Sequence, residues 1–202
     1  QPVLDQNDPE YLEQRGAARG RSYEADRHQG EGRPLRRQRL EAERGHWSVL
    51  ANPVTMTPVP LYPNSHNMDW WDGYPAERRE VLASLSGVRN PVVLSGARAL
   101  GVASVHDDPP GSPTVATEFL TQGIAHTTAY GEDRISILIN FLPGWQTYDL
   151  LEVGYARATV TLDAFVVDFM SVRGYGSDVL EPATRHSTWR VADGIPGAIR
   201  VA

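Results

Sequence analysis

The sequence of 202 residues contains neither cysteine nor lysine. Without cysteine, the chain can form neither a disulfide framework nor a thiolate metal site. Without lysine, it cannot contain the Gly-x-x-x-x-Gly-Lys loop of P-loop nucleotide-binding proteins. No run approaches the roughly 18 apolar residues that a membrane-spanning helix needs, so we expect no membrane span. The formal net charge of −6 argues against a general nucleic-acid binder, because phosphate backbones attract positive surfaces.

The rest of the composition is ordinary for a globular protein, with 41% hydrophobic and 22% charged residues. A chain of this length can fold as one domain or as a large part of a bigger one. It begins with Gln1 and shows no signal peptide, which we expect of a processed chain or of a piece of a longer protein. Residues 1–32 are polar, and we expect mainly loops there with one short helix over 9–14. Residues 33–202 then form the main domain.

Two segments in the first half of the chain each combine a helix with a following strand. The first helix is predicted over 35–44 and is followed by a strand over 47–51. The second helix is predicted over 75–86, because a proline opens it, a glycine follows it and its apolar residues recur at helical spacing. A short apolar strand over 91–94 comes next. Consecutive units of this kind need crossover connections, so at least part of the sheet should be parallel.

The second half of the chain is dominated by segments with strand character. Their apolar residues alternate or form short runs between turns rich in glycine, proline and aspartate. We expect strands over 100–105, 114–121, 134–141, 155–161 and 164–172, and a final pair within 186–202. The segments 155–161 and 164–172 should form a hairpin, because only two residues lie between them, which is the length of a tight turn. This string of strands fits one sheet edge or one layer of a sandwich.

Histidines and carboxylates gather in two loops, without the spacing of a metal site. The long loop over 52–75 contains His66, Asp69 and Asp72, which are weak candidates for metal ligands. No His-x-x-x-His pair supports that role, and we favour Asp72 as a capping residue for the helix that follows. His106, with the two aspartates after it, is a second weak candidate. Adjacent carboxylates in such a turn are commonly exposed turn formers.

The residues that follow the strand over 91–94 occupy the position where open α/β sheets usually bind ligands. Ser95 and Gly96 are expected to end the strand, and Ala97, Arg98 and Ala99 come next. The two alanine methyl groups can neither donate nor accept a hydrogen bond. Arg98 is a weak candidate for contact with an anion, because a guanidinium fork suits phosphate.

A serine hydrolase is a weaker interpretation of the same region. Ser95 precedes a glycine, but the Gly-x-Ser-x-Gly motif is absent. Ser95, His106 and Asp107 could be combined as nucleophile, base and orienting acid. With six histidines and many serines in the chain, however, such sets arise by chance.

Three motifs, Asn67-Met-Asp-Trp-Trp-Asp-Gly-Tyr-Pro75, the strand ending Val-Val-Leu-Ser-Gly96 and Val115-Ala-Thr-Glu-Phe-Leu120, together resemble the carboxy-terminal half of PhoD-like alkaline phosphatases. These are metal-dependent phosphoesterases of the calcineurin-like group. Trp47-Ser-Val-Leu-Ala-Asn52 and Gly154-Tyr-Ala-Arg-Ala-Thr-Val-Thr161 fit the same pattern. The resemblance covers roughly residues 33–202, in order, and its Trp-Asp-Gly-Tyr-Pro segment is fairly specific.

The resemblance implies an α/β fold, a layered metallophosphoesterase-like sandwich in which helices flank two β-sheets, and of which this chain holds an incomplete part. It implies hydrolysis of phosphate mono- or diesters with divalent or ferric ions of the Ca, Fe and Mn class. A family of this kind also implies an extracytoplasmic location, either secreted or periplasmic.

The chain departs from the family where the metal centre should be. The family has Gly-Asp-x-His after this strand, with Asp and His serving the metals, whereas Ala97 and Ala99 stand at these positions here. No Gly-Asp dipeptide occurs anywhere in the chain. Because a methyl group coordinates no metal, the resemblance implies that no catalytic site is intact. Asn52, Asp72 and Arg98 are the nearby candidates for site residues. Natural loss and deliberate replacement would leave the same sequence.

We therefore expect the chain alone to be impaired or inactive as a phosphoesterase and to hold no cofactor. The alternative hypothesis is a non-catalytic module on the same fold, which binds a phosphate ester, another anion or a protein partner. A missing amino-terminal half is one such partner.

Overall fold

The computed structural model describes residues 45–59, 70–96, 99–106, 112–123, 136–137, 139–172 and 182–202. The chain separates into two compact units, Gln1–Ala42 and Glu43–Ala202, and all described residues belong to the second. The helices predicted over 9–14 and 35–44 lie outside the described residues. No described helix is long and apolar enough to cross a membrane.

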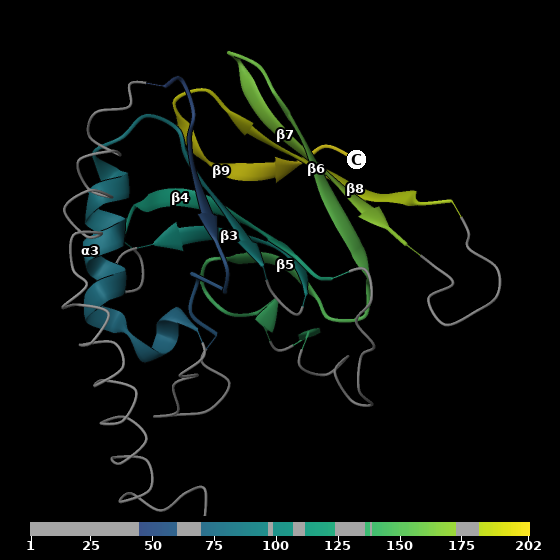
Figure 1. Cartoon of the computed structure of the whole chain (residues 1–202), viewed down its shortest axis with the longest axis horizontal. Coiled ribbons are helices and arrows are strands. Elements are labelled where there is room, and N and C mark those ends of the chain that lie inside the picture. The colour runs from purple at the N-terminus through teal and green to yellow at the C-terminus, as the bar shows by residue number, and fades with distance from the viewer. Residues whose placement is uncertain are drawn as a thin grey trace, which may run out of the picture. The chain divides into compact units, whose positions relative to one another are not determined.

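Five strands form the first sheet, in the order β1-β2-β4-β3-β5 (Figure 1). They are β1 (Ser48–Asn52), β2 (Pro91–Gly96), β3 (Leu100–His106), β4 (Thr114–Thr121) and β5 (Trp145–Asp149). Strands β1, β2 and β4 are parallel neighbours, whereas β3 runs antiparallel to both β4 and β5. The partly parallel sheet predicted from the two helix–strand units is therefore confirmed.

Strand β2 is longer than predicted and continues through Gly96. Its unbroken apolar run is explained by its place inside the sheet, where Val92 and Val93 are both fully buried on opposite faces. Ser95 and Gly96 do not end the strand, because they stay paired with Leu120 and Thr121 of β4.

Four antiparallel strands form the second sheet, in the order β6-β7-β8-β9. They are β6 (Gly154–Val160), β7 (Ala164–Ser171), β8 (Thr184–Ala192) and β9 (Ile195–Arg200). The predicted hairpin is β6–β7, and the predicted final pair is β8–β9. Gly154 must be a glycine, because a Cβ there would lie 1.8 Å from the Met170 carbonyl oxygen.

The two sheets pack face to face, and helix α3 (Pro75–Ser86) covers the other face of the first sheet (Figure 1). The core between the sheets includes Val92, Phe119, Phe165 and Trp189. A layered sandwich of two sheets is thus confirmed, but helical segments are few among the described residues that pack against it.

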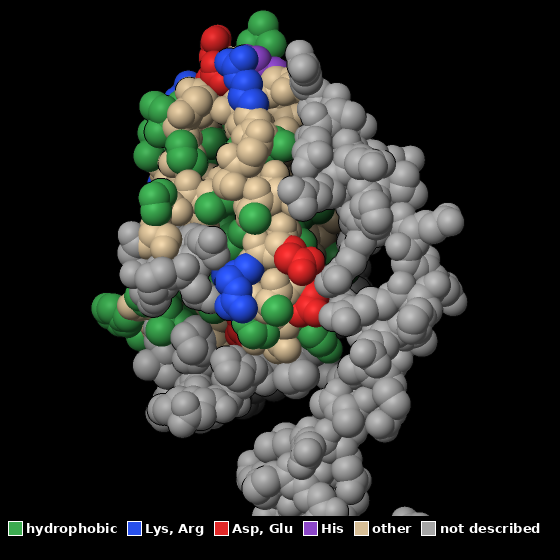
Figure 2. Space-filling model, turned by 90° about the vertical axis from the view of Figure 1, so that its left-hand side faces the viewer, with side chains coloured by type: hydrophobic (Ala, Val, Ile, Leu, Met, Phe, Trp, Pro, Cys, Tyr) green, Lys and Arg blue, Asp and Glu red, His purple; other side chains and the backbone are tan. Residues whose placement is uncertain are grey.

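Helix α3 has the bounds that the sequence predicted. Pro75 stands at its first position and Gly87 follows its end. Leu82 and Leu85 bury their side chains against the first sheet. The opposite side of α3 belongs to a face on which basic, acidic and hydrophobic side chains are mixed (Figure 2), as expected for a solvated surface.

The strand predicted over 134–141 is wrong for the residues described there. Ser136, Ile137 and Ile139 are helical, and the Asn140 amide donates a hydrogen bond to the Ser136 carbonyl oxygen at 3.1 Å. The alternating isoleucines suggested a strand, but Ile137 is 58% exposed while Ile139 is fully buried. This turn leads into β5, which the sequence did not indicate.

Candidate functional site

The carboxyl ends of the parallel strands β1, β2 and β4 meet at one edge of the first sheet, where α/β proteins usually bind ligands. Asn52 of β1 is paired with Ser95 of β2, and Gly96 is paired with Thr121 of β4. A hollow of about 490 Å³ opens beside these ends. It is lined by Pro53, Val54, Trp70, Gly96, Thr121, Gln122 and Gly123. We take this hollow as the candidate site.

Asn52, a sequence-predicted candidate, lies at this edge but is committed to protein partners. Its side-chain amide donates hydrogen bonds to the Val54 carbonyl oxygen and to Ser95 Oγ, the latter at 3.0 Å. Its amide oxygen accepts a hydrogen bond from Trp71 Nε1 at 3.0 Å. The residue is only 8% exposed. Asn52 therefore ties β1 to Ser95 and Trp71 rather than presenting a free ligand group.

Glu118 of β4 is a buried carboxylate beneath this edge that the sequence analysis did not select. It accepts hydrogen bonds from the amides of Met56 and Thr57, both at 2.7 Å, and from Ser95 Oγ at 2.5 Å. Complete burial raises the pKa of Glu118, although these hydrogen bonds oppose the shift. The carboxylate holds the segment after β1 against the sheet. A charged residue inside an apolar strand was the signal that could have identified it.

Ser95 is equally committed, since it accepts a hydrogen bond from Asn52 and donates one to Glu118. Its register also separates it from His106. Ser95 is paired with Leu120 at one end of β4, whereas His106 is paired with Thr114 at the other. That spacing along a strand is roughly 20 Å. The structure therefore does not bring together the histidine and serine of the hydrolase interpretation.

The predicted cap of α3 by Asp72 is wrong. The capping residue is Tyr74, and no side-chain hydrogen bond is made at that cap. Asp72 is instead buried in the 3₁₀ turn η1 (Trp71–Gly73) and accepts a hydrogen bond from the Val59 amide at 3.0 Å. The hydrogen bond from Val59 places the carboxylate at the loop after β1, away from the helix cap.

Of the positions where the family's metal ligands were expected, the structure describes Ala99. Its methyl group is fully buried in an apolar cluster with Ala103, Leu120 and Tyr148. Ala97 and Arg98 lie outside the described residues, as do His66 and Asp69. The backbone of His106 ends β3, and nothing is described of its side chain.

The described lining of the hollow does not fit a pair of metal ions. Such a centre needs several imidazole or carboxylate donors for each cation, whereas the lining offers a hydroxyl from Thr121 and an amide from Gln122. Within the described ranges, no three His, Cys, Asp or Glu side chains gather in one place. Both oxygens of the nearby Glu118 are already occupied by protein donors.

Gln122 is the second functional candidate that the sequence analysis missed. Its side chain is 3% exposed and lines the hollow. Neither its amide oxygen nor its amide nitrogen has a hydrogen-bond partner in the part of the chain that the structure describes. An unpaired buried amide costs about 1–3 kcal/mol, so it is a group that a ligand could satisfy. No sequence pattern marks Gln122 as functional, since glutamine is common in exposed loops.

Two comparisons with known proteins found a match. A family model described as PhoD-like phosphatase matches residues 35–169. A solved structure, described as the structure of PhoD, aligns with a TM-score of 0.68 and 22% sequence identity. The alignment covers 82% of this chain but 33% of that chain, so this chain spans about a third of the length of the matched protein. At this identity the match shows the fold alone. No curated protein matches the chain in sequence.

Proposed function

Because the chain belongs to the PhoD-like phosphatase family, we propose that it is the carboxy-terminal part of a phosphoesterase fold whose own catalytic centre is impaired or lost. The observation that carries this proposal is Ala99. It stands where the family places a metal-binding histidine, and its methyl group is packed into an apolar cluster. A methyl group there offers a cation no donor, and the packing leaves little room for a water molecule in its place.

Metal ions would supply a hydroxide nucleophile and stabilise the charge that develops on the phosphoryl oxygens. The described residues cannot replace that chemistry. Asn52 and Ser95 are saturated by protein partners, and the carboxylate of Glu118 faces amide donors beneath the hollow. The chain's contribution is therefore the shape of these strand ends, without a general base or a metal ligand among the described residues that line the hollow.

One observation favours a second candidate function, that of a non-catalytic binding module. The unpaired amide of Gln122 and the hydroxyl of Thr121 both line the hollow, and Trp70 provides an aromatic surface beside them. These groups can hold a phosphate ester or another anion by neutral hydrogen bonds, without cleaving it. From the family we also propose an extracytoplasmic location, to be tested by cell fractionation.

The deciding experiment measures metal content per chain and hydrolysis of p-nitrophenyl phosphate and bis(p-nitrophenyl) phosphate, with Mn²⁺, Fe³⁺ or Ca²⁺ added. We expect no tightly held metal and no turnover above the buffer rate. The same result is expected after Ala97→Asp and Ala99→His are introduced together, since two ligands do not make a two-metal centre. A pair of bound ions with turnover in the unmodified chain would refute the proposal.

The same preparations test the binding function, with inorganic phosphate titrated calorimetrically into the chain. Binding that is lost in Gln122→Leu and kept in Gln146→Leu, an exposed glutamine on β5, supports the module. Equal binding by both variants, or none by the unmodified chain, argues against it.

A further inference from the structure

The side-chain amide of Gln122 is a buried polar group of the candidate site that the protein leaves unsatisfied. Gln122 directly follows β4, is 3% exposed and lines the hollow. Among the residues that the structure describes, neither its amide oxygen nor its amide nitrogen has a hydrogen-bond partner. By contrast, Asn52, Ser95 and Glu118 are joined by a chain of hydrogen bonds. Gln122 therefore keeps its hydrogen-bonding groups for a ligand.

An amide presents one acceptor and one donor group side by side, and this limits the ligands that satisfy it. A phosphate oxygen accepts a hydrogen bond from the amide nitrogen of Gln122 but leaves the amide oxygen buried without a donor, which is costly. A ligand with an adjacent donor and acceptor of its own satisfies both atoms. Carboxamides and nucleobases have such an edge. The described lining includes no charged side chain, so it suits a neutral group of this kind.

Trp70 is the feature that favours nucleobases over carboxamides. Its side chain is half-buried, packs against the apolar cluster that contains Ala99 and Leu120, and lines the hollow together with Gln122. Nucleobases stack on aromatic side chains, whereas a carboxamide has no ring to stack. Among the bases, adenine is the one that a glutamine amide typically pairs with through two hydrogen bonds.

The turn that carries Trp70 is held in place by the protein itself. The Trp71 amide donates a hydrogen bond to the Thr55 carbonyl oxygen at 3.4 Å, and the Trp71 indole nitrogen donates one to Asn52 at 3.0 Å. A surface that is already ordered saves the cost of ordering it on binding. The volume of about 490 Å³ also lies within the range of roughly 300–1,000 Å³ that is typical of small-molecule pockets.

We infer that the hollow binds the adenine base of a nucleotide, stacked on Trp70 and hydrogen-bonded to both amide atoms of Gln122. The inference rests on the binding module proposed above, since it names the organic part of the phosphate ester that the module holds. The exocyclic amino group of adenine donates to the amide oxygen, and the neighbouring ring nitrogen accepts from the amide nitrogen. Because the base is neutral, the hollow needs no cation for this contact.

The test titrates four compounds calorimetrically into the full 202-residue chain: adenosine, adenosine 5′-monophosphate, ribose 5-phosphate and inorganic phosphate. The two compounds with the base should bind at least about tenfold more tightly than ribose 5-phosphate, because stacking and two hydrogen bonds are lost without the base. Purine riboside, which lacks the exocyclic amino group, should bind about tenfold more weakly than adenosine, because it leaves the amide oxygen of Gln122 unpaired.

Two substitutions test the two contacts separately. Gln122→Leu should weaken adenosine binding and remove the difference between adenosine and purine riboside, whereas the matched control Gln146→Leu, at an exposed position of β5, should keep both. Trp70→Leu should weaken both nucleosides, and Trp70→Phe should keep most of the binding, because phenylalanine still offers a ring for stacking.

Stability provides a readout that does not depend on a ligand. Gln122→Leu removes an unpaired buried amide and keeps a similar volume, so it should not lower the free energy of unfolding in urea. A clear loss of stability would show that the amide serves the fold, and it would overturn the inference. Circular dichroism checks the fold of the Trp70 variants.

The inference is also overturned if adenosine does not bind, if adenosine and purine riboside bind equally well, or if the two leucine variants of glutamine bind adenosine alike. Inorganic phosphate that binds through Gln122 while adenosine does not would support the anion-binding module and refute this ligand. Adenosine that binds through Gln122 while inorganic phosphate does not would support this ligand and count against anion binding. The proposed loss of the catalytic centre is tested apart from these titrations, by the metal and hydrolysis measurements.

Discussion

Two carboxylates, Glu118 and Asp193, join distant segments at opposite ends of the parallel strands, and they do so in opposite environments. Glu118 is fully buried near the carboxyl ends, and its partners are two amides and a hydroxyl. Asp193 lies in the turn between β8 and β9, beside the residues that precede β1 and β2, and its side chain is 33% exposed. It accepts hydrogen bonds from Arg89 and Asn90 and lies 3.2 Å from His46.

The pKa of each group follows from these surroundings. Removal from water raises the pKa of Glu118, because the neutral partners do not compensate a buried charge completely. Hydrogen bonds from Asn90 and Arg89 lower the pKa of Asp193. The comparison teaches that Glu118 stabilises the fold by satisfying backbone donors, whereas Asp193 does so as a charge. The first arrangement fails when a donor loses its acceptor, and the second weakens when the charge is screened.

The largest effect should come from Glu118→Ala. It leaves the amides of Met56 and Thr57 and the hydroxyl of Ser95 without their acceptor and opens a cavity in the core. We expect a loss of about 2–4 kcal/mol in the free energy of unfolding, measured with urea. Glu118→Gln keeps the volume but turns an amide donor toward other donors, so it should lose less.

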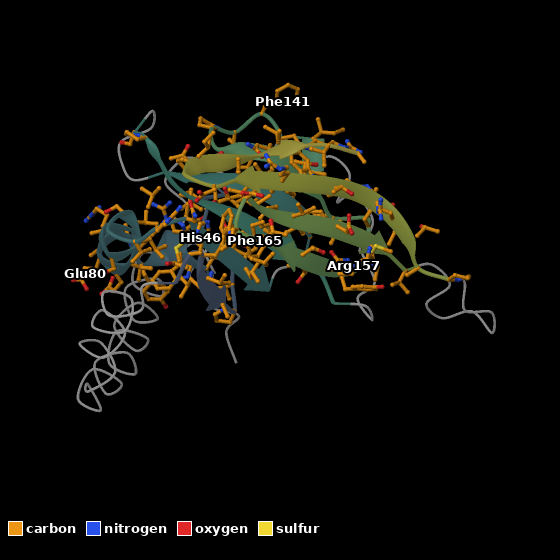
Figure 3. The ribbon with its side chains drawn as sticks, turned by 90° about the horizontal axis from the view of Figure 1, so that it is seen from above. His46, Glu80, Phe141, Arg157 and Phe165 are labelled. Carbon is orange, nitrogen blue, oxygen red and sulfur yellow. The ribbon has the colours of Figure 1, made fainter. Side chains whose placement is uncertain are left out.

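The control is Glu80→Ala, on the exposed side of α3 (Figure 3), which should change stability by no more than about 0.5 kcal/mol. If Glu118→Ala is as harmless as this control, Glu118 does not hold the segment after β1.

A smaller effect should come from Asn90→Ala, at the other end of the sheet. Asn90 has a positive φ of 48°, a conformation that costs an ordinary L-residue about 1–2 kcal/mol. Its side chain also donates to the His46 carbonyl oxygen and accepts from the Gly194 amide, both at 2.8 Å. We expect Asn90→Ala to lose about 1–2 kcal/mol in urea unfolding.

Asn90→Gly separates the two causes, because glycine adopts positive φ freely. If the two variants are equally destabilised, the side-chain hydrogen bonds carry the effect. If the glycine variant is close to the unmodified chain, the backbone conformation carries it.

The elements that were predicted well are those whose ends are marked locally. Helix α3 lies between a proline and a glycine, and β4 lies between turn residues. The segment over 134–141 misled the prediction, because alternating isoleucines also suit a turn in which one is buried and the next is not. Strand β5 has no apolar run of its own, and its pairing with β3 is a long-range contact that local patterns do not contain.

The location of the candidate site could be predicted from the sequence, but the roles of its residues could not. The strand end at Gly96 does line the hollow, because the carboxyl ends of parallel strands meet at one edge. Asn52 and Asp72 were selected by residue type, but their partners are groups brought near by folding, such as the Val59 amide. Glu118 and Gln122 were missed for the same reason, since burial and hydrogen bonding decide their roles.

The smallest effect is a difference in pH dependence, and its sign separates the two carboxylates. The folded state binds the proton of Glu118 more tightly than the unfolded state, because the folded pKa is raised from 4.5. The unmodified chain should therefore lose stability relative to Glu118→Gln as pH rises above 4.5 and through the raised folded pKa. Asp193 has a folded pKa below 3.8. Its stabilisation is complete above that value and disappears as pH falls through the folded pKa, so the unmodified chain should lose its advantage over Asp193→Asn only in acid.

Urea unfolding of the unmodified chain, Glu118→Gln and Asp193→Asn, from acid to neutral pH, measures both differences. Repeating it at high salt gives a second test. The advantage conferred by Asp193 should shrink in high salt, because its partners are charged and partly exposed. The difference due to Glu118 should not change, because its partners are neutral and buried. A flat difference between the unmodified chain and Glu118→Gln would mean that Glu118 has the same pKa folded and unfolded. The contrast drawn here would then be wrong for Glu118, because its burial would not distinguish it from a carboxylate that acts through its charge.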